Sequence, residues 1–62
     1  MDRIALFTRA ADMLDEDATC LEESHTRADG SWDLSDPVDE RAKADCDERR
    51  KVAACLRLLV DQ

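Results

Sequence analysis

Apolar residues near the start of the chain recur at alternating steps of three and four, the spacing of one face of an α-helix. A second apolar stripe lies beside the first and widens this face. Since neither Gly nor Pro occurs between Asp2 and Ser24, the pattern predicts one helix over about residues 2–25. The first stripe is Ile4, Phe7, Ala11, Leu14, Ala18 and Leu21, and the second is Leu6, Met13 and Cys20.

The helical pattern stops between residues 26 and 35 and then resumes. The only glycine, Gly30, follows an aspartate and indicates a turn, and Trp32 is expected to close this end of the molecule. Asp36 followed by Pro37 is typical of an N-cap and a first helical residue, so a second helix is predicted over about residues 36–61. Near its end that helix is apolar almost all round, so it must be covered on several sides.

Two long helices joined by about ten residues predict an all-α fold, an antiparallel two-helix hairpin forming one small domain over residues 1–62. A short third helical element in the loop is an open possibility. In such a hairpin, facing residues have numbers that sum to about 62, which places Ile4 near Leu58 and Leu59, and Leu21 near Ala42. The wide apolar faces need a further layer, supplied by the loop, a second copy or a target protein. Both a monomer and a homodimer are therefore open.

Charge is distributed unevenly along the chain. Sixteen acidic and nine basic residues give a net charge of −7. Residues 12–48 hold fourteen acids and three bases, whereas the two terminal segments together carry a net +4. This balance disfavours direct contact with nucleic acid or an anionic membrane.

Carboxylates on the first helix are spaced by roughly 5–6 Å, which is comparable with phosphates along a nucleic-acid strand. Such a row suits the cationic groove of a basic nucleic-acid-binding protein. An acidic helix that simply solvates its outer face is the ordinary alternative. The predicted partner-binding residues are Asp12, Asp15, Glu16, Asp17, Glu22, Glu23, Asp29, Asp33, Asp36 and Asp39.

No combination of residues indicates an enzyme. His25 has no nucleophile at a recognised spacing and is expected to interact with the last carbonyls of the first helix. Cys20, Cys46 and Cys55 are expected to be small core residues. No cofactor is expected, and a metal site made of Cys20, His25 and Cys46 is a remote alternative because the ligand spacing is not that of structural zinc sites. With no signal peptide or spanning segment visible, a cytoplasmic protein with reduced thiols is expected.

Short motifs add a resemblance. Leu21-Glu22-Glu23-Ser24-His25-Thr26, then Gly30-Ser31-Trp32 and Leu56-Arg57-Leu58-Leu59, resemble small proteins encoded by temperate phages of proteobacteria. In size and acidity the chain also resembles anti-CRISPR proteins, several of which mimic DNA on type I effector complexes. That resemblance implies an inhibitor acting in the infected bacterial cell, whose carboxylates occupy a DNA-binding surface of a CRISPR effector subunit. The alternative is a helical adaptor or assembly protein that self-associates through its apolar helix faces.

Overall fold

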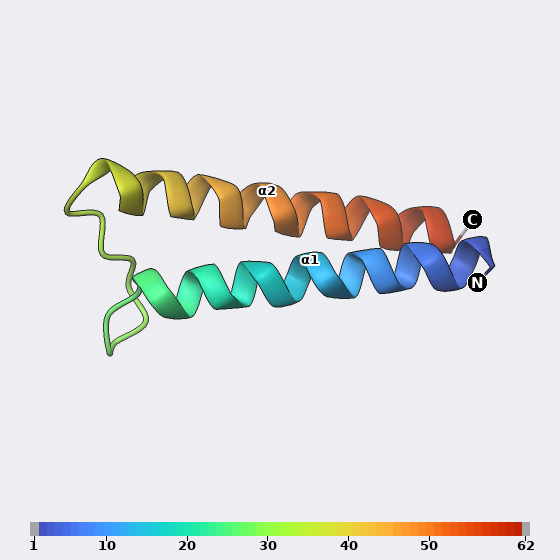
Figure 1. Cartoon of the computed structure of the whole chain (residues 1–62), viewed down its shortest axis with the longest axis horizontal. Helices are drawn as coiled ribbons and strands as arrows, with labels where there is room; N and C mark the ends of the chain where they lie inside the picture. Colours follow the sequence, from blue (N-terminus) through green and yellow to red (C-terminus); the bar gives the residue numbers. More distant parts are fainter. Residues whose placement is uncertain (1, 62) are drawn as a thin grey trace.

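Two long helices lying side by side make up the molecule (Figure 1). The computed structural model describes residues 2–61, in which α1 spans Arg3–His25 and α2 spans Pro37–Val60. The helices run antiparallel, so the two ends of the chain lie together, and the hairpin measures 42 × 17 × 16 Å. The predicted all-α hairpin is thus confirmed. Between the helices, residues 26–36 contain no third helix.

Both helices begin at an aspartate that caps the first turn. The carboxylate of Asp2 accepts a hydrogen bond from the Ala5 amide at 2.8 Å. Asp36 accepts from the amides of Val38 and Asp39 at 2.8 and 3.2 Å. These bonds satisfy amides that have no partner within the helix, which explains where the helices start.

Small side chains form the contact between the helices. The fully or almost fully buried residues are Ala11, Ala18, Ala42, Cys46 and Ala53, and Cys46 is the largest side chain among them. The Cys46 thiol donates a hydrogen bond to the Ala18 carbonyl at 3.4 Å, so a side chain of α2 reaches the backbone of α1. We call this contact the alanine seam.

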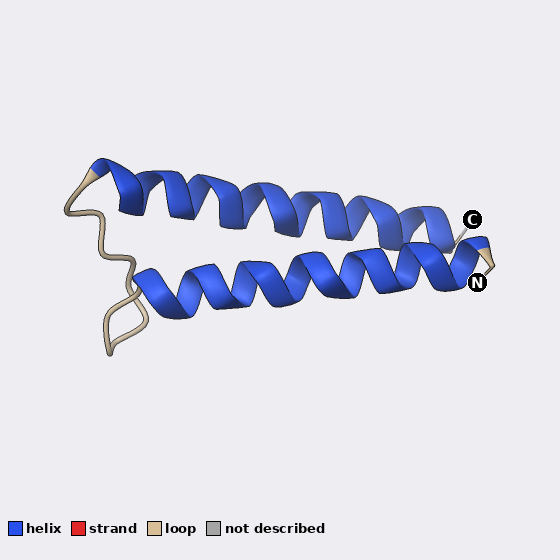
Figure 2. Ribbon diagram, viewed as in Figure 1, coloured by secondary structure: helices blue, strands red, loops and turns tan. Residues whose placement is uncertain are grey.

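The helix pairing differs slightly from the prediction. Cys46 contacts Ala18, and His25 contacts Asp39, so facing residues have numbers that sum to 64 and not 62. The value of 62 assumed a loop placed symmetrically across the two helix ends. The loop instead forms a tight turn beside the end of α1, on the side away from α2, before the chain crosses to α2 (Figure 2). The residues that were predicted to face each other still lie close together despite this change in pairing. Ile4 and Leu59 line one surface hollow, and Leu21 and Ala42 line another.

The loop is held by backbone hydrogen bonds. Thr26 and Trp32 form an isolated antiparallel bridge, and the Arg27 amide donates to the Ser31 carbonyl at 2.8 Å. Gly30 closes the turn with φ of +89°, a conformation in which a side chain would be strained. Trp32 is half-buried at this end of the hairpin, as expected for a residue that closes the loop.

Several apolar residues predicted to be in the core lie on the surface. Cys20 and Cys55 are exposed, so that part of the prediction is wrong for both and correct for Cys46. Ile4 is 60% exposed and Leu58 is 64% exposed. The reason is that two helices can bury only one stripe each, and the alanine seam occupies that stripe. Among residues 2–61, neither helix has an apolar stretch long enough to cross a membrane.

Candidate functional site

The ten carboxylates predicted to bind a partner divide into groups with different surroundings. On α1, Asp12 and Asp15 both pair with Arg57, at 2.9 and 2.6 Å, and Glu22 pairs with Arg50 at 3.5 Å. The cations come from α2, so these ion pairs tie the helices together along one side of the hairpin. Each partner is more than a third exposed, so the pairs contribute little stability and the carboxylates remain accessible.

One of these cations has a shifted pKa. The Cys46 side chain, together with the charge of Glu22, raises the pKa of Arg50 above its usual value. Arg50 therefore remains a fixed positive charge beside the acids of α1.

Two loop carboxylates stabilise turns. Asp29 accepts hydrogen bonds from the Ser31 hydroxyl at 2.6 Å and the Ser31 amide at 2.9 Å. Asp33 accepts from the Ser35 amide at 3.2 Å and lies 3.7 Å from the Arg27 guanidinium. These bonds from the serines lower the pKa of both carboxyl groups below 3.8. Both carboxylates therefore carry full negative charge at neutral pH, and both use it to stabilise turns of the loop.

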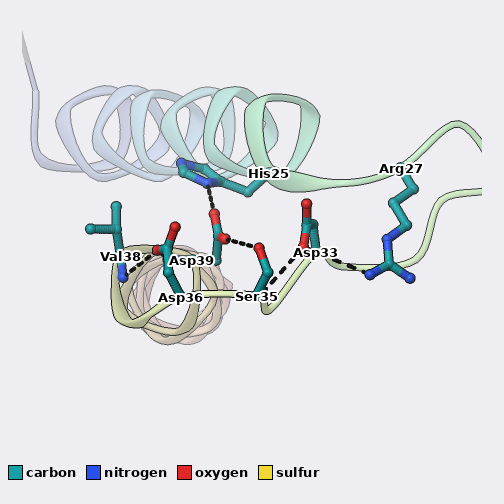
Figure 3. A network of polar contacts seen from close by, with 7 residues as sticks. All are labelled: His25, Arg27, Asp33, Ser35, Asp36, Val38 and Asp39. Carbon is teal, nitrogen blue, oxygen red and sulfur yellow. Dashed lines mark hydrogen bonds and ion pairs between the residues drawn. The ribbon is translucent and has the colours of Figure 1, made fainter.

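Asp36 and Asp39 join the loop to the helices (Figure 3). Asp36 caps α2, while Asp39 contacts the His25 Nδ1 at 2.8 Å through one oxygen and the Ser35 hydroxyl at 3.4 Å through the other. The His25 ring therefore bridges to α2, and the prediction that it interacts with the last carbonyls of α1 is wrong. Helical spacing could not reveal this contact, because it depends on the pairing of the two helices. Asp36 and Asp39 therefore hold the loop in place, and their carboxylate oxygens are already engaged within the chain.

Three of the ten carboxylates have no ion pair or hydrogen bond within residues 2–61: Glu16, Asp17 and Glu23. All three are exposed side chains of α1. Glu16 and Glu23 lie seven residues apart and therefore share one side of the helix.

Two further carboxylates in the same situation were missed from the sequence. Glu40 and Glu48 of α2 are exposed and have no partner among the described residues. The signal was present, because the neighbouring acids Asp45 and Asp47 are matched by Arg41 and Lys43 four residues earlier, at 3.3 and 3.1 Å. Glu40 and Glu48 have no cation four residues away, and the lysines three residues after them, Lys43 and Lys51, do not pair with them within residues 2–61.

All but one of the unpartnered acids lie in one half of the hairpin. With facing residues summing to 64, the hairpin divides into a terminal half, residues 2–14 and 50–61, and a loop half, residues 15–49. Among residues 2–61 the only unpartnered acid of the terminal half is Asp61, and the other five lie in the loop half; we call these five the open acids: Glu16, Asp17, Glu23, Glu40 and Glu48.

Ionised carboxylates accept hydrogen bonds and donate none, so the groups that complement this surface are lysine and arginine side chains. Within residues 2–61 no three His, Cys, Asp or Glu side chains are placed to hold a metal ion together. The alternative metal set is separated in particular, since Cys46 is buried against Ala18 whereas Cys20 is exposed.

The comparisons with known proteins identify no relative: no family model, curated protein or solved structure matches the chain.

Proposed function

We propose that this chain is a small binding protein whose acidic loop half docks on a cationic, nucleic-acid-binding surface of a partner protein and excludes nucleic acid from it. The observation that carries the proposal is the gathering of the five open acids in the loop half of a narrow hairpin. Their charges are not used within the described part of the chain, so they can be used by a partner.

The surrounding charges support the same function. The other acids of the loop half are tied to local partners but remain partly exposed, so they add to the negative potential around the open acids. Like charges placed close together destabilise an isolated helix by a few tenths of a kcal/mol per pair. A cationic groove would relieve this repulsion and would also steer the approach of the hairpin.

A CRISPR effector subunit that binds target DNA is the specific partner we propose, following the resemblance to anti-CRISPR proteins. The hairpin is 17 × 16 Å across, narrow enough to lie along a groove built for a nucleic-acid duplex. Such a target would place the chain in the cytoplasm of the infected bacterium.

Competition tests this proposal directly. A purified type I effector complex is incubated with labelled target DNA and increasing amounts of the chain, and DNA binding is followed by fluorescence anisotropy. We expect the chain to displace DNA, and we expect its own binding to weaken as salt rises. A triple neutralisation, Glu16→Gln, Glu23→Gln and Glu40→Gln, should weaken competition about tenfold, because three contacts of roughly 0.5 kcal/mol each add to about 1.5 kcal/mol.

The matched control changes the net charge by the same three units in the terminal half. Thr8→Lys, Ala54→Lys and Asp61→Asn alter exposed residues and leave the open acids untouched. Circular dichroism checks that both variants stay helical. Equal weakening by the two triple variants would show that only overall charge matters, and failure to displace DNA would reject the effector complex as the target.

A further inference from the structure

One side of the terminal half carries large apolar side chains that the hairpin does not cover. Leu6, Met13, Val52 and Leu59 are 53%, 51%, 44% and 44% exposed. Between these four residues lie half-buried Phe7, Leu14 and Leu56. We call these seven residues the apolar face.

Helical geometry places the apolar face opposite the ion pairs between α1 and α2. At about 100° per residue, Leu6 and Met13 lie roughly 120–160° from Ala11 and Ala18, so they extend the apolar face around the outer side of α1, away from Asp12 and Asp15. On α2, Val52 and Leu59 lie on the same side of the hairpin as Leu6 and Met13, opposite Arg57. A surface hollow lined by both Leu14 and Val52 agrees with this placement.

The hairpin exposes more surface than its mass requires. A folded monomer of 7.0 kDa exposes about 4,000 Å², whereas this chain exposes 4597 Å². Its buried core consists of four alanines and one cysteine, so the large apolar side chains contribute little while they remain in water. A cover for the apolar face would supply the layer that two helices alone lack.

The charges beside the apolar face select the occupant. In the loop half, the same side of the hairpin carries Asp17, Asp45 and Glu48 together with Arg41 and Arg49, all lining the hollow that contains Leu14 and Val52. Arg3, which lies over the Phe7 ring at 5.5 Å, balances the remaining charge. This side is therefore neutral although the chain carries −7, so two copies can approach through it without strong repulsion.

We infer that a second copy of this chain covers the apolar face, giving a homodimer of two hairpins packed side by side. Because the apolar residues occupy only the terminal half, terminal half must meet terminal half. A side of 42 × 17 Å has an area of about 700 Å², so the copies must touch along the whole side to approach the roughly 800 Å² per partner of a stable interface. Contact along the whole side, with terminal half on terminal half, places α1 of one copy against α2 of the other and Asp17 near the level of Arg49 of the second copy.

Mass measurement on the full chain tests the inference. Sedimentation equilibrium should give twice 7.0 kDa at high concentration and a lower average mass on dilution. Val52→Glu should raise the dissociation constant of the dimer at least about 30-fold, the effect of losing a strong anchor residue. Leu58→Glu is the matched control, since Leu58 is an exposed apolar residue on the opposite side of the hairpin and should leave the mass unchanged.

An exposed thiol reports whether the two copies overlap side by side. In a Cys55→Ser background, a spin label on Cys20 marks the loop half while Cys46 stays buried. Side-by-side copies should give a distance between the two labels shorter than the 42 Å length of the hairpin, and a longer distance would reject the arrangement. A mass of 7.0 kDa at every concentration, or equal effects of Val52→Glu and Leu58→Glu, would overturn the inference. Neither result bears on the proposed competition with DNA, because its test neutralises Glu16, Glu23 and Glu40, which lie away from the contact side.

Discussion

The alanine seam should not tolerate a larger side chain. Ala53 is 1% exposed and, with facing residues summing to 64, lies level with Ala11, which is fully buried. One step along the seam, the Cys46 sulfur already reaches the Ala18 carbonyl at 3.4 Å. A leucine at position 53 would add three carbon atoms where the opposing helix backbone is close, so Ala53→Leu should force the helices apart.

The expected cost follows from overpacking. Extra methylenes in a well-packed core cost about 1–3 kcal/mol, whereas a domain of this length has a total free energy of unfolding of about 3–9 kcal/mol. For so small a domain each kcal/mol shifts the melting temperature by about 4–8 °C. A central cost of about 2 kcal/mol therefore lowers the melting temperature of Ala53→Leu by about 8–16 °C.

The assay is thermal unfolding followed by circular dichroism at 222 nm, at one fixed protein concentration. Ala54→Leu is the control because Ala54 is the next residue along the helix and is exposed, so the same change there should cost less than about 0.5 kcal/mol. If the melting temperature of Ala53→Leu lies within 2–3 °C of that of Ala54→Leu, a difference on the order of 0.5 kcal/mol, the helices are not held by close contact of small residues.

Three further substitutions test the contacts around the loop. Asp36→Ala should lower the free energy of unfolding by about 1 kcal/mol through loss of the α2 cap, and Asp36→Asn should restore most of it; equal loss in both would contradict a capping role. His25→Ala should cost about 1 kcal/mol in urea unfolding, since it removes the 2.8 Å contact with part-buried Asp39, and an unchanged midpoint would refute that contact. Ser31→Ala should raise the pKa of Asp29 toward 3.8, followed by the carboxyl ¹³C shift in NMR. Because the folded pKa is the lower one, the contribution of Asp29 to stability is present above pH 3.8 and is lost as pH falls through the folded value; a pKa of Asp29 that does not move in the variant would disprove the role of Ser31.

Local sequence signals were sufficient to predict where the helices begin and end, but not which residues form the contact between them. Asp36 followed by Pro37, and the turn at Gly30, mark boundaries that depend on nearby residues alone, so the helix limits could be predicted to within one residue at all four ends. Burial depends instead on which stripe of each helix faces the other. The predicted stripe of α1 contained Ala11 and Ala18, but the spacing did not show that these alanines, and not the larger members of the stripe, would let the backbones come closest and take the central position.

The candidate site was predictable as a region and not as a set of residues. Counting charges located the acidic part of the chain between residues 12 and 48. Which carboxylates stay open depends on cations that arrive from the other helix, as Arg57 does for Asp12 and Asp15, and sequence spacing does not show such pairs. The partners of Asp29 and Asp33 could be read from the sequence, because Ser31 and Ser35 follow them by two residues, a spacing typical of Asx turns.

The apolar face and the open acids lie in different halves of the hairpin, so dimerisation and partner binding should depend differently on salt concentration. Each copy carries −7, so two copies repel at long range, and the neutral contact side only limits that repulsion. Raising the salt concentration from 0.1 to 1 M shortens the screening length from about 10 to 3 Å and weakens the repulsion. The proposed homodimer should therefore be as tight or tighter at high salt, because apolar burial is not screened. Binding of the open acids to a cationic groove should weaken over the same range. Sedimentation and competition assays run at matched salt concentrations measure the two effects. A dimer that dissociates as salt rises would mean that ion pairs between the copies, and not Leu6, Met13, Val52 and Leu59, hold it together.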